Sequence, residues 1–282
     1  MGTYAVTGSA SGMGAAVVVR LRSAGHEVIG VDITDADVVA DLSTASGRTA
    51  AATAVLERCG GRLDGAVMAA GLGPERGKQR LIAQVNFLGV VELLEAWRPA
   101  LAHADRAKVV AFSSNSTTTM PMVPGRAVRA LLDRDVEKAL GTLKVFGKMA
   151  PQFAYGASKI ALSHWVRQQA VTREWAGEGI RLNAIAPGAI RTPLLERGLA
   201  DGSAEAKQIR SFPVPIGGFG DAGQLADWVV FMLSDAADFL CGSVVFVDGG
   251  SDAWFRARDW PRPVPARRLR GYLARMKEFR AS

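Results

Sequence analysis

The chain has 282 residues, 49% hydrophobic and 22% charged, with a net charge of +7. Its length fits one α/β domain of about 250 residues with an appendage, and its composition excludes global disorder. Residues 1–252 are formally neutral and the positive excess lies after them, so we expect no nucleic-acid partner, which would need basic residues over a folded face.

The cysteines, histidines and apolar runs indicate where the protein is located and which kinds of site it lacks. Cys59 and Cys241 are the only cysteines, so we expect no disulfide framework and a reducing, cytoplasmic location. Histidines and cysteines are never closely spaced, so we expect no metal site. No apolar run reaches the roughly 18 residues of a transmembrane helix, and Thr3–Val6 reads as a strand rather than a signal peptide.

Short apolar runs alternate with longer helical patterns along the chain. This alternation predicts an α/β fold with a Rossmann-type, doubly wound parallel sheet between two helical layers. The expected strands are Thr3–Thr7, Glu27–Asp32, Gly65–Ala69, Lys108–Ser113, Arg181–Ala186 and Ser243–Val247, with a short one at Val38–Ala40. The expected helices include Gly12–Ala24, Arg80–His103 and Tyr155–Glu174.

A glycine-rich turn follows the first predicted strand. Gly8, Gly12 and Gly14 lie between that strand and the first predicted helix. Glycines allow a tight turn and let phosphate oxygens approach the backbone, while the helix N-terminus offers unpaired N–H groups. Although glycines also mark ordinary loops, this context predicts a nucleotide site that includes Ser11 and Met13.

Asp32 ends the second predicted strand. A carboxylate there accepts hydrogen bonds from ribose hydroxyls and repels a 2′-phosphate, and residues 33–35 add no Arg or Lys. We therefore expect NAD rather than NADP; the alternative is a solvated carboxylate at a strand end. Asp41 and Leu42 are expected to border the adenine, although an exposed aspartate would look the same in sequence.

Tyr155 and Lys159 are four residues apart in a predicted helix, so they share one face. A nearby ammonium stabilises a phenolate, so we expect Lys159 to lower the pKa of Tyr155. Such a tyrosine can move the proton that accompanies hydride transfer. The pair alone is common on solvated helix faces, and it becomes specific only beside the nucleotide site.

Two further polar positions border the same predicted crevice. Ser113 and Ser114 end a strand, where hydroxyls point toward the ligand, and Ser114 lies one residue further out. We expect Ser114 to hold a substrate carbonyl. Asn86 lies within a helical pattern although Asn is a poor helix former, which suggests a kink or a held water; a surface asparagine is the alternative.

Together these residues resemble the short-chain dehydrogenase/reductase family from Thr3 to about Ala253. The shared motifs are Thr7-Gly8-x-x-x-Gly12-x-Gly14, Asn86, Ser114, Tyr155-x-x-x-Lys159, Asn183, Pro187-Gly188 with Thr192, and Val247-Asp248-Gly249-Gly250. The resemblance implies an NAD-dependent enzyme that acts on CH–OH groups.

The resemblance also implies a role for each matching residue. Tyr155 would be the general acid/base, and Lys159 would bind the nicotinamide ribose and lower the Tyr155 pKa. Ser114 would orient the carbonyl, and Asn86 would support a water relay. The expected cofactor contacts are Gly8, Ser11, Gly12, Met13, Gly14, Asp32, Asp41, Leu42, Ala70, Gly71, Tyr155, Lys159, Pro187, Gly188, Ile190 and Thr192.

The sequence departs from the family pattern in two places. Met68-Ala69-Ala70-Gly71 stands where the family usually carries Asn-Asn-Ala-Gly, so hydrogen bonding there must be met otherwise. Ser114 and Tyr155 are 41 positions apart, far more than is usual, so residues 117–150 look like a helical insertion with a helix over Arg126–Leu140. With this insertion the chain is similar to the family's bacterial 3-alpha-hydroxysteroid dehydrogenase/carbonyl reductases, and also to its coniferyl alcohol dehydrogenases.

The insertion allows two interpretations. Its Met, Leu and Val side chains would form either an apolar lid over a bulky substrate or a packed subdomain, since such residues at helical spacing are usually core. It should obstruct the family's common four-helix dimer contact, so the expected homodimer or homotetramer would use another surface.

Residues 254–282 form a basic extension after the catalytic domain of residues 1–253. Residues 260–265 read as a stiff, proline-rich linker. After it, apolar side chains recur at helical spacing among basic ones, which predicts an amphipathic helix. Docking on protein is favoured for its apolar side, and contact with an anionic membrane surface is the alternative. The apolar positions are Leu269, Tyr272, Leu273, Met276 and Phe279.

We therefore expect hydride transfer between NAD and a secondary alcohol or ketone on a bulky, apolar small-molecule substrate, and the resemblance implies a 3-alpha-hydroxysteroid or a similar compound. The alternatives are a dehydrogenase of aromatic alcohols, a broad reductase of xenobiotic carbonyls, or a nucleotide-sensing protein without catalysis. The complete set of Ser114, Tyr155 and Lys159 disfavours the last of these.

Overall fold

The fold was obtained as a computed structural model, which describes residues 1–200 and 204–281. One sheet contains seven parallel strands in the order β3-β2-β1-β4-β5-β6-β9, which confirms the predicted Rossmann-type fold. The strands are β1 (Thr3–Thr7), β2 (Glu27–Asp32), β3 (Val38–Val39), β4 (Gly65–Met68), β5 (Lys108–Phe112), β6 (Arg181–Pro187) and β9 (Val244–Val247). A separate pair joins β7 (Ile190–Arg191) to β8 (Gly220–Asp221).

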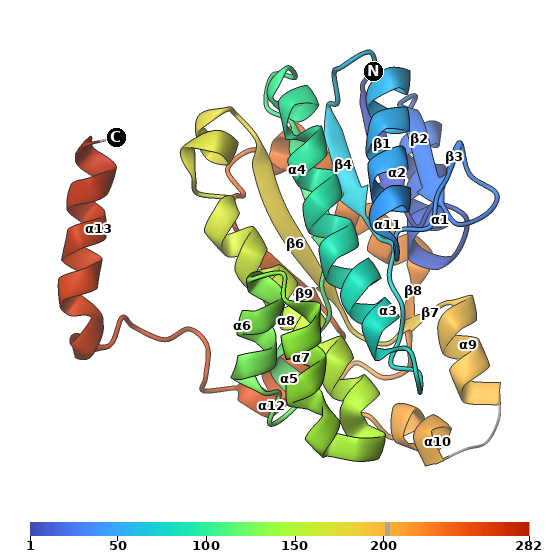
Figure 1. The fold of residues 1–282 in the computed structure, drawn as a ribbon, viewed down its shortest axis with the longest axis vertical. Helices are drawn as coiled ribbons and strands as arrows, with labels where there is room; N and C mark the ends of the chain where they lie inside the picture. The colour runs from blue at the N-terminus through green and yellow to red at the C-terminus, as the bar shows by residue number, and fades with distance from the viewer. Residues whose placement is uncertain (201–203, 282) are drawn as a thin grey trace.

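Helices cover both faces of the sheet (Figure 1). Successive β1 side chains divide between the two cores: Tyr4 and Val6 pack toward one helical layer and Ala5 toward the other. The first layer contains α1 (Gly12–Ser23) and α11 (Ala222–Leu233), and the second contains α2 (Ala45–Arg58), α4 (Gly89–Ala102) and α8 (Ala150–Gln169). Because both faces are buried, the strands are apolar almost throughout, as their sequence indicated.

The strand order reverses beside β1, and this position fixes where a ligand can bind. β1 pairs with β2 on one side and with β4 on the other, both in parallel. The chain therefore leaves the carboxyl ends of β1 and β4 in opposite directions and opens a crevice between them.

The predicted helix at Arg80–His103 is divided by a wider turn. α3 (Gln79–Ala83) leads into the π-helical turn η1 (Gln84–Leu88), and α4 follows. Asn86 lies in η1 and is fully buried, so the kink that its sequence position suggested is present. The predicted helix at Tyr155–Glu174 starts earlier, at Ala150, and ends at Gln169, because Thr172 is extended and begins the turn η3 (Arg173–Gly177).

The insertion contains several helices, so the single helix predicted over Arg126–Leu140 was wrong. Arg134 adopts a left-handed conformation with φ 60°, and the Asp135 side chain accepts a hydrogen bond from the Lys138 N–H to begin a new helix. Buried apolar side chains of this unit join the core around α8. The elements are α5 (Ser116–Thr119), α6 (Gly125–Leu132), α7 (Val136–Leu143) and η2 (Lys144–Met149).

Five α-helices follow β6 in the described part of the chain, and α11 is one of them. α9 (Pro193–Ala200) and α10 (Ala204–Arg210) lie on either side of the undescribed residues 201–203, and α12 (Ser251–Arg256) follows β9. α13 (Leu269–Ala281) stands apart from the body (Figure 1), and Ser282 of the predicted extension lies outside the described residues. Within the described residues, no helix is long and apolar enough to cross a membrane.

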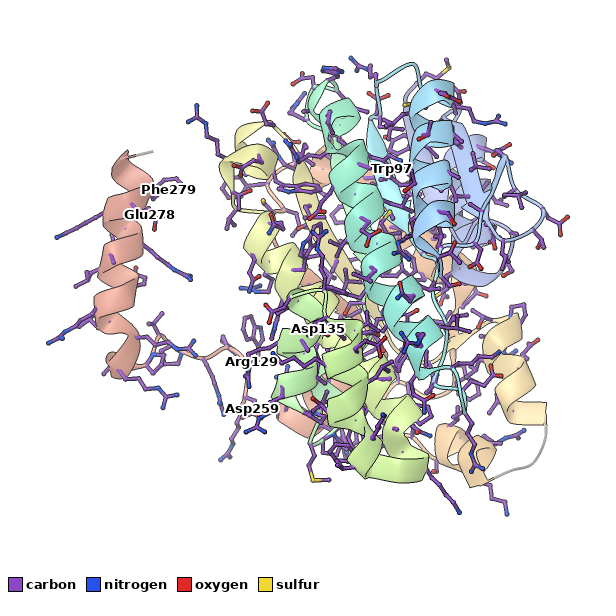
Figure 2. The ribbon with its side chains drawn as sticks, viewed as in Figure 1. Trp97, Arg129, Asp135, Asp259, Glu278 and Phe279 are labelled. Carbon is purple, nitrogen blue, oxygen red and sulfur yellow. The ribbon has the colours of Figure 1, made fainter. Side chains whose placement is uncertain are left out.

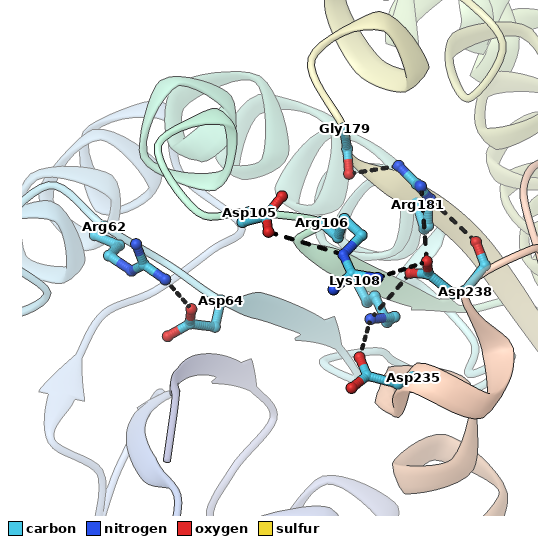
Figure 3. Close-up of polar contacts among 9 residues, drawn as sticks. All are labelled: Arg62, Asp64, Asp105, Arg106, Lys108, Gly179, Arg181, Asp235 and Asp238. Carbon is cyan, nitrogen blue, oxygen red and sulfur yellow. Dashed lines mark hydrogen bonds and ion pairs between the residues drawn. The ribbon is translucent and has the colours of Figure 1, made fainter.

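A cluster of charged side chains closes the amino edge of the sheet (Figure 3). Lys108, at the start of β5, is 5% exposed, and its Nζ lies 3.3 Å from Asp235 and 3.4 Å from Asp238. Arg106 and Arg181 pair with the same Asp238, at 3.1 and 4.0 Å. At this edge every buried charge therefore has an opposite charge beside it.

Candidate active site

The glycine-rich turn and the start of α1 form one wall of the crevice. Gly8 has φ +70°, its N–H donates to the Val31 carbonyl at 2.8 Å, and a Cβ there would lie 2.7 Å from the Ala70 nitrogen. A Cβ on Gly14 would lie 2.1 Å from the Gly8 oxygen. Ser11, the N-cap of α1, makes no side-chain capping hydrogen bond. The backbone is thus bare and its helix N-terminus is open to an anion such as a pyrophosphate.

Asp32 lies at the end of β2 and ties the turn to this strand. Its Oδ2 accepts a hydrogen bond from the Ala10 N–H at 2.9 Å, and its Oδ1 accepts one from the Ile33 N–H at 2.7 Å. Each carboxylate oxygen keeps further acceptor capacity, so this side chain can still take hydroxyl donors. The position fits the ribose contact that its sequence predicted.

The adenine-side residues have structural roles of their own. Asp41 is exposed, and its Oδ1 accepts from the Ser43 N–H at 2.9 Å in the turn that begins α2. Leu42 is buried in the core, and its carbonyl accepts from Arg48 Nη1 at 3.1 Å. Contact between these two residues and an adenine remains a prediction.

Lys159 is buried beneath the catalytic face of α8. Its Nζ donates to the Phe112 carbonyl at the end of β5 at 2.6 Å, and it is 5% exposed. Burial lowers the pKa of Lys159 to about 8, because the apolar surroundings disfavour the charged form. Among the described residues, no carboxylate pairs with it.

The Ser114 hydroxyl lies beside the Tyr155 phenol. Burial raises the pKa of the Tyr155 phenol above its usual range, and the neighbouring Ser114 hydroxyl opposes this rise. The predicted lowering of the pKa by Lys159 was therefore wrong. The Lys159 Nζ lies 6.0 Å from the phenol ring centroid and is bonded to a carbonyl, so burial outweighs its charge.

The two serines after β5 point toward different neighbours. Ser113 points toward α8, where its Oγ lies 2.7 Å from Ser163 Oγ. Ser114 is the one in contact with Tyr155, and its Oγ also accepts from the Ser116 N–H at 3.1 Å. The structure therefore brings together Ser114 and Tyr155, the pair that the sequence selected for contact with substrate.

Asn86 holds the loop after β4 through two hydrogen bonds of its side-chain amide. Its Oδ1 accepts from the Leu72 N–H at 2.7 Å, and its Nδ2 donates to the Leu72 carbonyl at 2.9 Å. A Cβ on Gly71 would lie 3.4 Å from this Oδ1 and 3.7 Å from Lys159 Nζ, so the three residues are neighbours. Asn86 thus positions the loop beside Lys159, and its water relay remains a prediction. Ala70, before this loop, donates its N–H to Thr7 Oγ1 at 3.2 Å.

The segment after β6 forms the opposite wall. The Pro187 carbonyl accepts from the Asn115 N–H at 2.9 Å, and the Gly188 N–H donates to the Val247 carbonyl at 3.0 Å. Ile190 is buried in the short strand β7. A Cβ on Gly12 would lie 3.5 Å from Thr192 Cγ2, so this wall meets the glycine-rich turn at the start of α1.

Sequence reasoning did not single out three further polar residues at this edge. Ser9 Oγ, Asn115 Nδ2 and Ser116 Oγ are buried and have no hydrogen-bond partner among the described residues. Unmet polar atoms are costly in a protein interior and fit a site that a ligand completes. The only sequence signal was their place directly after a buried strand, which many loop residues share.

A cavity of about 760 Å³ lies between α11 and residues 214–220. Its lining includes Gly188 and Ile190 but neither Ser114 nor Tyr155. Ser114 and Tyr155 therefore lie outside this cavity, beside the insertion. There Met120 and Val123 of the insertion lie 2.8 and 3.1 Å from the position of a Cβ on Gly156.

Comparisons with known proteins agree with this geometry. A family model described as enoyl-(acyl carrier protein) reductase matches residues 139–252. The 3-alpha-hydroxysteroid dehydrogenase/carbonyl reductase of Comamonas testosteroni is 38% identical over 91% of this chain and 98% of that protein. A coniferyl-alcohol dehydrogenase of a Pseudomonas species is 31% identical over 87% of this chain and 94% of that protein. The solved structure of 3-alpha-hydroxysteroid dehydrogenase from Pseudomonas sp. B-0831, complexed with NADH, has a TM-score of 0.85 and 41% identity, over 91% of this chain and 99% of that chain.

Proposed function

Because the chain belongs to the short-chain dehydrogenase/reductase family and is an oxidoreductase of alcohol or ketone groups, we propose that it is NAD-dependent and acts on a bulky, apolar secondary alcohol or ketone. The observation that carries the proposal is that the Ser114 hydroxyl, the Tyr155 phenol and the buried Lys159 lie together at the carboxyl end of β5. When bound, the nicotinamide would supply the hydride acceptor or donor.

Side chains of the protein would hold the substrate oxygen and transfer the proton. The Ser114 hydroxyl holds the substrate oxygen next to the Tyr155 phenol. In ketone reduction Tyr155 donates its proton to the carbonyl oxygen; in alcohol oxidation the deprotonated Tyr155 takes the hydroxyl proton. Since burial keeps Tyr155 protonated at neutral pH, the resting enzyme is ready for reduction, and oxidation gains from alkaline conditions.

The preference for NAD follows from Asp32. Its carboxylate would repel a 2′-phosphate, and Arg22, which reaches the neighbouring Val28 carbonyl, is paired with Asp37 at 3.2 Å. We expect Asp32→Asn to lower the ratio of kcat/KM for NAD over NADP by about tenfold or more. The exposed Asp35→Asn serves as the control and should leave the ratio unchanged. An unchanged ratio in Asp32→Asn would remove Asp32 as the determinant of cofactor choice.

The substrate class is inferred from the relatives and from the apolar insertion. We propose a 3-alpha-hydroxysteroid or a similarly bulky compound, because Met120 and Val123 lie against α8 one residue from Tyr155. The test is NADH formation by purified protein with NAD and a 3-alpha-hydroxysteroid, beside coniferyl alcohol and a blank. Turnover of the steroid supports the proposal, and turnover of coniferyl alcohol alone moves the enzyme to aromatic alcohols. If neither compound gave NADH, both substrate classes would be rejected.

We also propose that the protein is a homo-oligomer built on the β9 edge. β9 ends the sheet and is only half-buried, and Trp228 and Phe231 of α11 are 46% and 47% exposed nearby in the cavity lining. The insertion packs against α8, and the sequence analysis expects it to obstruct the four-helix dimer contact that is common in the family. Light scattering of the protein and of Trp228→Glu tests this: the variant should be smaller, and a monomeric parent would refute the proposal.

A further inference from the structure

The segment after α12 is the most exposed part of the molecule. α13 lies away from the body of the chain in both views (Figure 1 and Figure 2). Every residue from 260 to 279 is exposed. The helix predicted from the sequence therefore exists, but it does not bury its apolar side on the body of its own chain.

One side of α13 is apolar. Leu269, Tyr272, Leu273 and Met276 follow the spacing of a single helix face and are between 41% and 53% exposed. An uncovered stripe of this kind indicates a binding surface, since an amphipathic helix normally covers its apolar side. The stripe is flanked by basic residues and one acidic residue, Glu278. The basic residues are Arg267, Arg268, Arg270, Arg275 and Lys277.

A second copy of the chain or a lipid surface could cover this stripe, and the positive charge of α13 favours one of them. Residues 1–252 carry equal numbers of basic and acidic side chains, so a second copy offers no net negative charge to this helix. Among the described residues, no acidic side chain of the body forms an ion pair with α13. An anionic lipid surface complements both features, because it takes apolar side chains at the acyl boundary and cations at the headgroups.

We propose that α13 binds the surface of a bilayer that contains anionic phospholipid. The helix would lie in the plane of the interface, with Leu269, Leu273 and Met276 toward the acyl chains. At 13 residues it is about 20 Å long, too short to span a bilayer and long enough to lie on one.

The segment that carries α13 leaves the body of the protein beside the active site. α12 packs against α5 (Ser116–Thr119), which begins two residues after Ser114. Residues 257–268 then connect α12 to α13 and span at most about 40 Å when extended. Membrane binding would therefore hold the mouth of the site within a few tens of ångströms of the lipid.

The test is co-sedimentation of the full chain with vesicles of phosphatidylglycerol and phosphatidylcholine, and with vesicles of phosphatidylcholine alone. We expect binding to the anionic vesicles only, reduced at high salt. Each basic residue near an anionic surface contributes a factor of about five. The triple variant Arg270→Ala, Arg275→Ala, Lys277→Ala should therefore bind about 100-fold more weakly. A control with three exposed basic residues of the body replaced by alanine should bind normally: Arg58→Ala, Lys138→Ala and Arg173→Ala.

Two further variants complete the test. Leu273→Asp lowers the net charge by only one unit, from +7 to +6, and should abolish binding because it puts a carboxylate on the apolar side. Truncation after Pro265 should abolish binding entirely. Turnover should be unchanged in both, so vesicle binding is decided apart from the proposed reaction. Failure of the parent protein to bind anionic vesicles, or full binding by the truncated chain, would overturn the proposal. Loss of the oligomer on truncation without vesicle binding would show that α13 covers a second copy instead.

Discussion

The two ends of strand β5 hold two buried lysines in opposite circumstances. Lys108 begins the strand at the amino edge, Lys159 donates to the Phe112 carbonyl at its carboxyl edge, and each is 5% exposed. Lys108 has Asp235 and Asp238 beside it. Lys159 has no ion pair within the described chain, and burial lowers its pKa to about 8.

The different surroundings of Lys108 and Lys159 indicate that the amino edge of the sheet stabilises the fold and that the carboxyl edge carries the chemistry. At the amino edge each buried charge is neutralised, which is the arrangement of least cost. At the carboxyl edge the buried Lys159 has no opposite charge beside it, and Ser9 Oγ, Asn115 Nδ2 and Ser116 Oγ have no hydrogen-bond partner among the described residues. A protein keeps such groups where a ligand supplies the missing partners. The same parallel sheet therefore separates a structural edge from a reactive one.

The largest effect should come from removing one hydroxyl at the carboxyl edge. Tyr155→Phe should lower kcat/KM by about a thousandfold, because general acid–base catalysis is lost. NADH binding, followed by fluorescence, should remain. The matched control is Tyr4→Phe, a buried tyrosine of β1 away from the site, which should leave turnover unchanged. Comparable losses in both variants would remove the distinction between the edges.

The pH dependence of the two reaction directions should differ in sign. Because the pKa of Tyr155 is raised, its protonated form dominates at neutral pH and its deprotonated form grows only under alkaline conditions. The rate of alcohol oxidation should therefore rise with pH up to at least about 9, and ketone reduction should not. Steady-state kinetics in both directions measure this. An oxidation rate that peaks in acid would contradict the assignment of Tyr155 as the base.

A smaller effect should follow from crowding the insertion against α8. A Cβ on Gly156 would press on Met120 and Val123, and the methionine can shift. We expect Gly156→Ala to raise KM for a bulky steroid by about tenfold and to leave a small ketone almost unaffected. The control is Gly141→Ala in α7, where a Cβ meets nothing within 4 Å. Equal effects on large and small substrates would mean that the insertion does not border the substrate.

The smallest effect should lie at the amino edge. Burial acts to raise the pKa of Asp238, but Arg106 and Lys108 outweigh it, so this pKa lies below its usual range. A lowered pKa stabilises the fold above the unfolded value of about 4, and this contribution is lost as pH falls through the folded value. Asp238→Asn should therefore lower Tm at pH 7 by a few degrees with turnover intact. The two proteins should become equal in Tm in acid; a constant gap would point to packing instead.

Much of the fold could be predicted because each strand is a short apolar run between turn residues. β1 and β2 have the predicted bounds, since both are buried on two faces and end at Gly8 or Asp32. The division of the helix at Asn86 and the break at Arg134 could not be located. They depend on the hydrogen bonds of Asn86 with Leu72 and on a left-handed residue that the helical pattern conceals.

The candidate site was predictable in its members but not in its electrostatics. The spacing of Tyr155 and Lys159 and the place of Ser114 after a strand were enough to bring them together. The direction of the Tyr155 pKa shift was not, because it depends on how deeply the phenol is buried and on where Lys159 directs its Nζ. The exposure of α13 was likewise unpredictable, since periodicity does not say what covers an apolar face.

The most direct test compares Lys159→Met with Lys108→Met by thermal unfolding and turnover. The pKa of Lys159 is lowered from 10.5 to about 8, so the unfolded chain holds its proton more tightly, and the resulting penalty is full below pH 8 and vanishes as pH rises toward 10.5. That penalty is about 3 kcal/mol, and loss of the bond to Phe112 returns about 1 kcal/mol.

At pH 7 Lys159→Met should therefore be about 2 kcal/mol more stable than the parent and inactive. Lys108→Met, which loses two ion pairs with partly exposed partners, should be less stable by about 1–2 kcal/mol and remain active. If Lys159→Met instead lost stability and kept its turnover, the carboxyl edge would be no more reactive than the amino edge, and the account would be wrong.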